Sequence, residues 1–408
     1  MRRRLVLALV VLLAPPRAMA DDALTALLER VAGEHAGAVQ VVVGITTPEG
    51  RSVTAHPGTA GSAADGTALF EIGSLTKVFT GLLLADAVVH GEVAFETPVG
   101  DLLPDAASMG GEGPSLLDLA THTSGLPRLP PNLQPRALDN PYADYHEEDL
   151  LAVLPSLPRH DTPQPFVYSN LGSGLLGQAL AWHAGTDYAT LLQARVLKPL
   201  GLHETMVDVP PGLAQRRAPA HDATGRPTAY WDFSALAGAG ALNASADDLL
   251  SLLDAYLDRR PSPLAEAMRQ QLANRRAGNA GIAAAAVGWF VEELAGRTIA
   301  WHNGSTGGTR SFMGFDTTHG IGVVVLTNTT ALDVTPLGLR LLRNGLPEAG
   351  SFPHDKEVTM LRSMLGGATL GAALAIANPA PVAAQPAATP TAQQASELDQ
   401  AYRTAPKR

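Results

Sequence analysis

β-Branched runs lie near both ends of this sequence, and most of the chain between them has the patterning of helices. The run 38–44, a turn at 47–50 and a short segment at 52–56 predict a hairpin. Three more strands are expected towards the other end, at 298–302, 311–316 and 321–328. Strands at both ends with helices between them indicate one antiparallel sheet assembled from distant segments, with a helical insertion.

The insertion sets the expected domain organisation. Residues 74–285 read mostly as helices and loops rich in proline and glycine, including a helix from Asp247 to Leu257 with Ser245 as its N-cap. The sequence therefore predicts an α/β (α+β) fold. Its antiparallel sheet, flanked by helices, comes from about 21–73 and 286–345, and an all-helical part comes from about 74–285.

The N-terminus has the layout of a secretory signal. Three arginines precede an apolar stretch that ends at Ala14, and Ala18-Met19-Ala20 is a small-residue cleavage site. The apolar stretch is shorter than the ~20 residues of a membrane span. We therefore expect residues 1–20 to be removed and the protein to be periplasmic or secreted, the alternative being an uncleaved anchor.

The C-terminal segment differs in composition from the rest. Residues 379–395 are almost entirely proline, alanine, glutamine and threonine, without periodicity. We expect 351–408 to be a low-complexity, disordered tail and 21–350 to be the globular domain, with no further domain after it.

Charge and cysteine content exclude several functions. The chain has 29 basic and 39 acidic residues, and loss of four arginines with the signal takes the net charge from −10 to about −14. This balance argues against nucleic acid as a partner. There is no cysteine, so disulfides, thiol catalysis, thiolate metal sites and a lipid-modified cysteine are all excluded. A soluble monomer is expected.

A serine and a lysine three residues apart precede a strongly apolar helical run. The octet Phe70–Lys77 (FEIGSLTK) leads into 78–84. Ser74 is expected in the first helical turn, where free N–H groups favour developing negative charge, with Lys77 on the same face. Burial in this run should lower the pKa of Lys77, and a neutral amine can take the proton of a serine hydroxyl.

The pair is weak evidence alone, because S-x-x-K arises by chance in a chain of this length. Only four of the 29 basic residues are lysines, however, and arginine cannot act as a base at neutral pH. The alternative is that Ser74 caps the helix and Lys77 extends its amine to the surface.

Tyr168 and Asn170 stand just before another apolar helix. A tyrosine at such a junction can present its phenol to a cleft, where a neighbouring cation would favour phenolate. Asn170 offers a donor and an acceptor to an amide. The alternative is a core tyrosine followed by an asparagine cap.

A glycine-rich segment, 301–308 (WHNGSTGG), lies between two expected strands. Glycines at a strand edge allow close approach of a substrate backbone. His302 would supply a donor or a positive charge near a substrate carboxylate. The alternative is a glycine-rich hairpin with a surface histidine.

These three elements in this order resemble the class C β-lactamase and D-alanyl-D-alanine peptidase family of serine hydrolases, whose motifs are S-x-x-K, Y-[SA]-N and [KH]-x-G. The octet resembles the class C signature, with Thr76 where Ser or Ala is usual. The segment 119–127 (LATHTSGLP) is similar to the family's LLTHTSGLP, and 305–308 continues the third motif as in class C enzymes. The resemblance covers about 24–345.

The resemblance implies a β-lactamase/transpeptidase-like fold with the active site between the sheet and the helical part. Ser74 would attack a carbonyl and form an acyl-enzyme, and Lys77 and Tyr168 would move its proton. The backbone N–H groups of Ser74 and Ser305 would form the oxyanion hole. Substrate binding would fall to Asn170 for a side-chain amide and to His302, Asn303 and Gly304 at the carboxylate end. No cofactor and no metal are expected.

Two departures bear on the substrate. His302-Asn303-Gly304 stands where dedicated class C enzymes carry Lys-[TS]-Gly, a form common among family peptidases and esterases. The segment 128–131 also lacks the glutamine that class C enzymes place near there. The leading hypothesis is β-lactamase-type hydrolysis. The alternatives are a D-alanyl-D-alanine carboxypeptidase or peptidase, a small-ester hydrolase and, more remotely, a non-catalytic peptidoglycan-binding relative.

Overall fold

The β-branched run near the N-terminus forms the strand β1 (Val41–Thr47), which lies inside a sheet. In this computed structural model β1 pairs antiparallel with β2 (Gly50–His56) on one side and with β10 (Ile321–Thr327) on the other. The residues that the structure describes are 16–33, 39–58, 65–104, 113–160, 162–279, 281–294 and 296–344. The first strand of the sheet in chain order is therefore paired with the last, β10. The sequence predicts such a sheet, assembled from distant segments.

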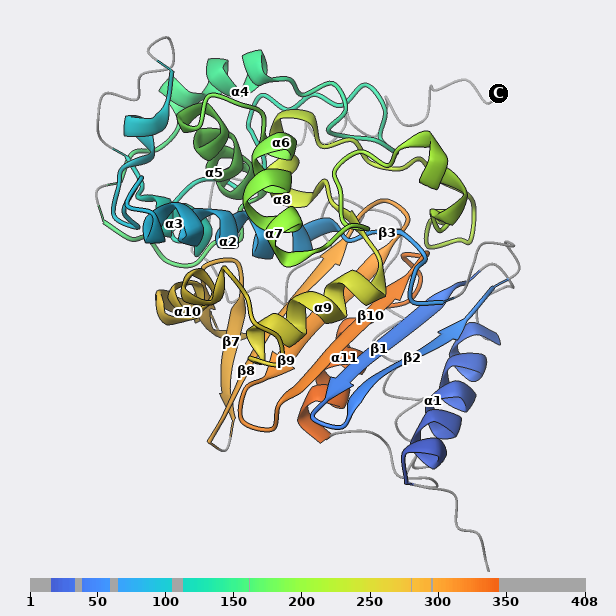
Figure 1. The fold of residues 1–408 in the computed structure, drawn as a ribbon. Helices are drawn as coiled ribbons and strands as arrows, with labels where there is room; N and C mark the ends of the chain where they lie inside the picture. Colours follow the sequence, from blue (N-terminus) through green and yellow to red (C-terminus); the bar gives the residue numbers. More distant parts are fainter. Residues whose placement is uncertain are drawn as a thin grey trace, which may run out of the picture.

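Within the described residues, eight strands form this sheet in the order β2-β1-β10-β9-β8-β7-β6-β5 (Figure 1). All neighbours are antiparallel. The strands not yet given are β9 (Arg310–Asp316), β8 (Arg297–Ser305), β7 (Phe290–Leu294), β6 (Ile282–Ala286) and β5 (Arg275–Asn279).

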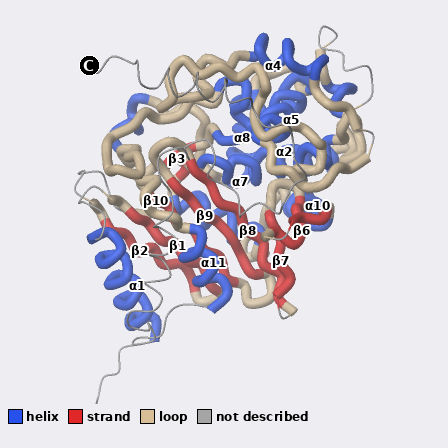
Figure 2. Tube along the Cα trace, turned by 180° about the vertical axis from the view of Figure 1, so that it is seen from behind, coloured by secondary structure: helices blue, strands red, loops and turns tan. Residues whose placement is uncertain are grey.

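Helices cover both faces of the sheet, as the two opposite views show (Figures 1 and 2). On one face α9 (Ala246–Tyr256) packs on β1 and β10, with α10 (Ala265–Ala273) beside it. On the other, α11 (Thr335–Asn344) packs on β9 and β10, and α1 (Pro16–Gly33) packs on β2. Side chains of a strand alternate between the faces, so Val324 joins the core on the α9 side and Val325 the core on the α1 and α11 side.

The helical part is centred on α2 (Thr76–Val89) and α5 (Asn170–His183). The apolar run after Lys77 explains the position of α2, because nearly every residue of this helix is buried. The other helices there are α3 (Leu116–Ala120), α4 (Glu147–Val153), α6 (Tyr188–Leu192), α7 (Lys198–Leu200) and α8 (Ala237–Gly240). A small sheet of β3 (Phe70–Glu71) and β4 (Asn243–Ala244) lies where this part meets the large sheet.

The structure differs from the expected division into sheet and helical parts in two ways. The sheet begins again at Arg275 rather than near 286, because β5 and β6 belong to it, and α9 and α10 pack with the sheet although they lie within 74–285. The β6 sequence is mostly alanine, which favours helices. Its pairing with β5 on one side and β7 on the other makes it a strand. The predicted helix 247–257 is confirmed within one residue, and Ser245 caps it by accepting a hydrogen bond from the Asp248 N–H.

The predicted signal and tail fall largely outside the described residues. Of the signal, only 16–20 are described, as the first turns of α1, while the tail 351–408 lies wholly outside. None of the described helices combines the length and apolarity that crossing a bilayer requires.

Candidate active site

Ser74 lies in a single 3₁₀ turn, η1 (Gly73–Leu75), that leads directly into α2. Strand β8 packs against this turn at a distance that only glycine allows. A Cβ at Gly304 would lie 2.0 Å from the Ile72 carbonyl oxygen and 3.0 Å from the Ser74 nitrogen, and one at Gly73 (φ +49°) would lie 2.8 Å from the Ser305 nitrogen. The two amides predicted to form the oxyanion hole therefore belong to segments in direct contact.

Lys77 points back to Ser74 from the first turn of α2. Its Nζ lies 3.0 Å from Ser74 Oγ, 2.9 Å from Asn170 Oδ1 and 2.8 Å from the Ala239 carbonyl oxygen. The side chain is buried, and neither Ser74 nor any other side chain caps α2. The alternative of a helix cap with a surface lysine is therefore wrong.

The protonation state of Lys77 follows from this environment. Burial, and then the charge of Arg128, hold the pKa of Lys77 well below its usual value, as the sequence predicts. The oxygens of Asn170 and Ala239 can only accept, so they take two N–H groups of a neutral amine. Its lone pair then remains for the Ser74 hydroxyl, the arrangement that a general base needs.

Tyr168 lies beside this pair, with Lys77 Nζ 4.8 Å from the centre of its ring. Burial raises the pKa of Tyr168 by more than Ser74 and Arg128 lower it. The phenol therefore rests protonated, contrary to the expected phenolate. Among the described residues no group has full hydrogen-bond geometry to its buried hydroxyl, although Ser74 lies near enough to lower its pKa, so the phenol can donate its proton to a group placed beside Ser74.

Asn170 is the first residue of α5, but it does not cap this helix. Ser169 is the cap, because its Oγ accepts a hydrogen bond from the Gly172 N–H. The Asn170 side chain instead joins Lys77 to Tyr142, whose hydroxyl accepts a hydrogen bond from Asn170 Nδ2 at 3.3 Å.

His302 differs from its expected character. It is 1% exposed and stacks on Phe290 at 4.5 Å between ring centres, so it is not a surface residue. Burial and Lys77 lower the pKa of His302 to about 3, which leaves the ring neutral. Its Nδ1–H donates to the Asn303 carbonyl oxygen, and the buried Nε2 has no partner in the described structure. The positive charge or donor predicted here is therefore absent from the resting site.

Asn303 and Gly304 complete the third motif within β8. The side chain of Asn303 donates a hydrogen bond to Thr335 Oγ1 at 3.0 Å, at the start of α11. Gly304 has no side chain, and this allows β8 to lie directly beside Ser74. Their contacts with a substrate stay predictions.

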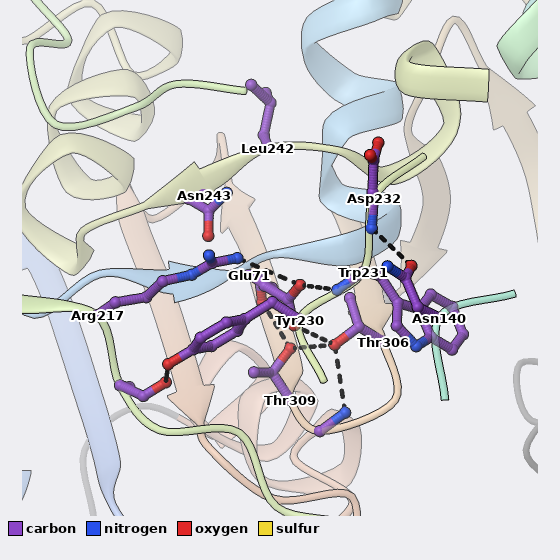
Figure 3. A network of polar contacts seen from close by, with 12 residues as sticks. Glu71, Asn140, Arg217, Tyr230, Trp231, Asp232, Leu242, Asn243, Thr306 and Thr309 are labelled. Atoms are coloured by element: carbon purple, nitrogen blue, oxygen red, sulfur yellow. Dashed lines mark hydrogen bonds and ion pairs between the residues drawn. The ribbon is translucent and has the colours of Figure 1, made fainter. Parts of the chain in front are cut away.

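Glu71 connects the nucleophile segment to the third motif, a role that sequence reasoning missed (Figure 3). Its buried carboxylate accepts hydrogen bonds from the Trp231 N–H at 2.6 Å and from Thr306 Oγ1 at 2.8 Å, and Arg217 lies 3.5 Å away. Burial raises the pKa of Glu71 against these hydrogen bonds. Its place in the octet was visible, but its partners lie 146 to 235 positions away.

His122 holds Tyr168 in place and was likewise missed, although the motif 119–127 contains it. Its carbonyl oxygen accepts the Val167 N–H at 2.9 Å and its Nδ1 accepts the Ser169 N–H at 3.2 Å. The two rings lie 4.4 Å apart. His122 adopts a φ of +61°, an uncommon value for a residue other than glycine.

The fold, together with a serine hydroxyl that is hydrogen-bonded to a buried lysine, is that of a serine hydrolase. The Beta-lactamase family model matches residues 23–343, and the chain belongs to this family. A β-lactamase of Pseudomonas fluorescens is 26% identical over 295 residues, which are 64% of this chain and 79% of that protein. The D-alanyl-D-alanine-carboxypeptidase/endopeptidase AmpH of Escherichia coli (strain K12) is 29% identical over 191 residues, which are 46% and 48% of the two chains.

Solved structures agree with this assignment. The class C β-lactamase from Rhodobacter sphaeroides aligns with a TM-score of 0.65 at 26% identity, over 76% of this chain and 94% of that one. The predicted family and the predicted fold are thus confirmed.

Proposed function

We propose that this chain is an exported β-lactamase-type enzyme that hydrolyses the β-lactam amide through an acyl-enzyme on Ser74. The observation that carries the proposal is the contact of a buried, low-pKa Lys77 with Ser74 Oγ, its other two hydrogen bonds being fixed by Asn170 and Ala239. The similarity to class C enzymes supports the substrate class.

Acylation begins with transfer of the Ser74 proton to neutral Lys77. Ser74 Oγ then bonds to the carbonyl carbon, and the N–H groups of Ser74 and Ser305 stabilise the oxyanion. As the C–N bond breaks, the protonated Tyr168 gives its proton to the departing nitrogen, and Lys77 returns a proton to Tyr168.

Deacylation reverses these roles with water as the nucleophile. Lys77, neutral again after acylation, takes one proton from the water, the resulting hydroxide oxygen bonds to the acyl carbon, and the bond between that carbon and Ser74 Oγ breaks. Lys77 then gives its proton to Ser74 Oγ. The product leaves as the free acid, which carries the oxygen and the other proton of the water.

A peptidase or small-ester hydrolase is the second candidate, and His302 is the residue that favours it. The neutral imidazole cannot attract a carboxylate next to the scissile bond as a lysine would. This favours an ester without such a group, because a D-alanyl-D-alanine peptide carries one as a β-lactam does. The relationship to the E. coli peptidase supports the peptidase.

Intact-mass spectrometry of the full chain, mixed with a penicillin or a cephalosporin, tests the proposal. Consumption of the compound with a short-lived adduct is expected, and none of either with Ser74→Ala. A persistent adduct on Ser74 would favour the peptidase. Neither adduct nor consumption would favour an esterase. Binding without turnover by the wild type, unchanged in Ser74→Ala, would indicate a non-catalytic relative.

A further inference from the structure

Arg128 lies next to the catalytic groups and is held there by its backbone. It directly follows the segment 119–127, and its carbonyl oxygen accepts the N–H groups of Asn170 at 2.9 Å and Leu171 at 3.2 Å. Its guanidinium carbon lies 5.3 Å from the centre of the Tyr168 ring. The main chain of Arg128 is thus fixed to the start of α5, and its side chain is partly exposed beside the phenol.

The guanidinium has no acidic partner in the described part of the chain. Among the described residues, no carboxylate, carbonyl or hydroxyl oxygen accepts a hydrogen bond from it. Its contact there is with the face of the Tyr168 ring. Two other arginines near the site do face carboxylates: Arg217 lies 3.5 Å from Glu71 and Arg310 lies 3.8 Å from Asp333. Arg128 therefore keeps its five donors available.

The charge of Arg128 acts on the whole site. It lowers the pKa of Lys77, His122, Tyr142 and Tyr168. No carboxylate contributes to the pKa of Lys77, His122 or Tyr168, although acidic residues outnumber basic ones in the chain. A site in which a guanidinium faces no carboxylate attracts anions.

We infer that Arg128 binds an anionic group of the substrate, a carboxylate, and makes the site selective for anionic substrates. The inference rests on the proposed function and specifies the substrate class. The third motif does not supply this charge, because His302 is neutral and its N–H is already donated to Asn303. A guanidinium can bind a carboxylate through two parallel hydrogen bonds.

The competing role for Arg128 is to keep Lys77 deprotonated by repulsion. That role would affect every substrate alike, since the base is the same. Binding of a carboxylate affects only substrates that carry one. Matched substrates therefore separate the two roles.

Two ester pairs locate the anion. 4-Nitrophenyl butyrate and 4-nitrophenyl hemisuccinate have acyl groups of equal length and differ by a carboxylate in place of the terminal methyl group, and phenyl acetate and 3-acetoxybenzoate differ by a carboxylate in the leaving group. For each pair we would measure kcat/KM of the wild type, Arg128→Gln, Arg128→Lys and Arg136→Gln. Arg136 is the matched control because its side chain is 84% exposed and lies on the same connecting segment.

In at least one pair, the preference for the anionic ester is expected to fall about tenfold or more in Arg128→Gln and to survive in part in Arg128→Lys. It should be unchanged in Arg136→Gln, and in the wild type it should weaken with added salt. Circular dichroism melting checks that the variants fold.

Equal loss on both members of each pair, or no loss, would overturn the role of Arg128 while leaving the hydrolase intact. If the wild type forms no adduct with β-lactams and hydrolyses none of the esters, the proposed function fails and this inference fails with it.

Discussion

At the residue scale, reactivity comes from the placement of one amine. Lys77 is buried, and two of its three hydrogen bonds end on oxygens that only accept. Burial in this setting lowers the pKa of a lysine because it penalises the charged form.

Lys77→Arg tests this role, because arginine stays protonated and cannot take the Ser74 proton. Acylation by a chromogenic cephalosporin should fall about 10²–10⁴-fold. In the wild type, kcat/KM should rise with pH as Lys77 loses its proton and level off well below 10.5, the pKa of an unperturbed lysine. A variant that acylates at the wild-type rate would rule out Lys77 as the base.

Gly304→Ala tests the contact between β8 and the nucleophile turn. The new Cβ would lie 2.0 Å from the Ile72 carbonyl oxygen, so the strand must move away from Ser74. We expect a loss of about 1–3 kcal/mol in the free energy of unfolding and a lower kcat. Gly212→Ala is the control, because nothing lies within 4 Å of its added Cβ. Similar urea midpoints and rates for the two variants would contradict this reading.

Local spacing predicted that Ser74 and Lys77 meet, and the apolar run around Lys77 predicted its lowered pKa, but the charge states of His302 and Tyr168 were not predicted. Ser74 and Lys77 are one helical turn apart, so the motif alone places them together. The neutrality of His302 depends on Phe290 and Lys77 packed around it, and the protonated state of Tyr168 depends on its burial. The residues in these contacts are far apart in the sequence, so local spacing does not reveal that they meet.

At the element scale, the buried Asp316 joins the sheet to α11. It ends β9 and pairs with Arg297 of β8 at 2.7 Å. Arg297 also donates to the carbonyl oxygens of Leu342 and Arg343 in α11. One side chain thus fixes the helix that covers this end of the sheet.

Asp316→Asn is expected to lower the free energy of unfolding by about 3 kcal/mol at pH 7, because it leaves Arg297 without its charged partner. Burial raises the pKa of Asp316, but hydrogen bonds from Arg297 and His319 outweigh it and hold this pKa below 3.8. The stability that the ionised carboxylate supplies is complete above the unfolded pKa and is lost as pH falls through the folded one.

Urea unfolding at pH 7 and at decreasing pH below 4 measures the difference between wild type and Asp316→Asn. The gap should narrow only in the acidic range. A constant gap down to the lowest pH at which both proteins fold would show that the ionisation of Asp316 does not cause the difference.

The elements themselves were predicted unevenly. Helices cover β1 and β10 on both faces, so these strands consist of continuous β-branched runs, and such runs can be recognised in the sequence. The alanine-rich β6 and the polar β5 were not recognised, because their strand conformation comes from pairing, of β6 with β7 and of β5 with β6, and not from local preference.

At the scale of the whole molecule, the predicted cleavage site lies within α1. Cleavage after Ala20 would leave Leu24 and Leu28, the buried side chains by which this helix joins the core beside the sheet. We therefore expect the exported protein to begin at Asp21 and to fold. Intact mass of the periplasmic fraction measures this, with Ala20→Arg as a variant that should resist cleavage. An uncleaved wild-type chain in that fraction would contradict the signal assignment.

The pairing of β1 with β10 also limits when folding can finish. The first hairpin is complete at His56, but its inner strand gains its second neighbour only when Ile321–Thr327 is available. Closing so long an intervening segment is entropically costly and makes folding slow. A chain that crosses a membrane from its N-terminus therefore cannot complete this sheet on the near side until almost the whole domain has been made, which leaves time for its transfer in an unfolded state.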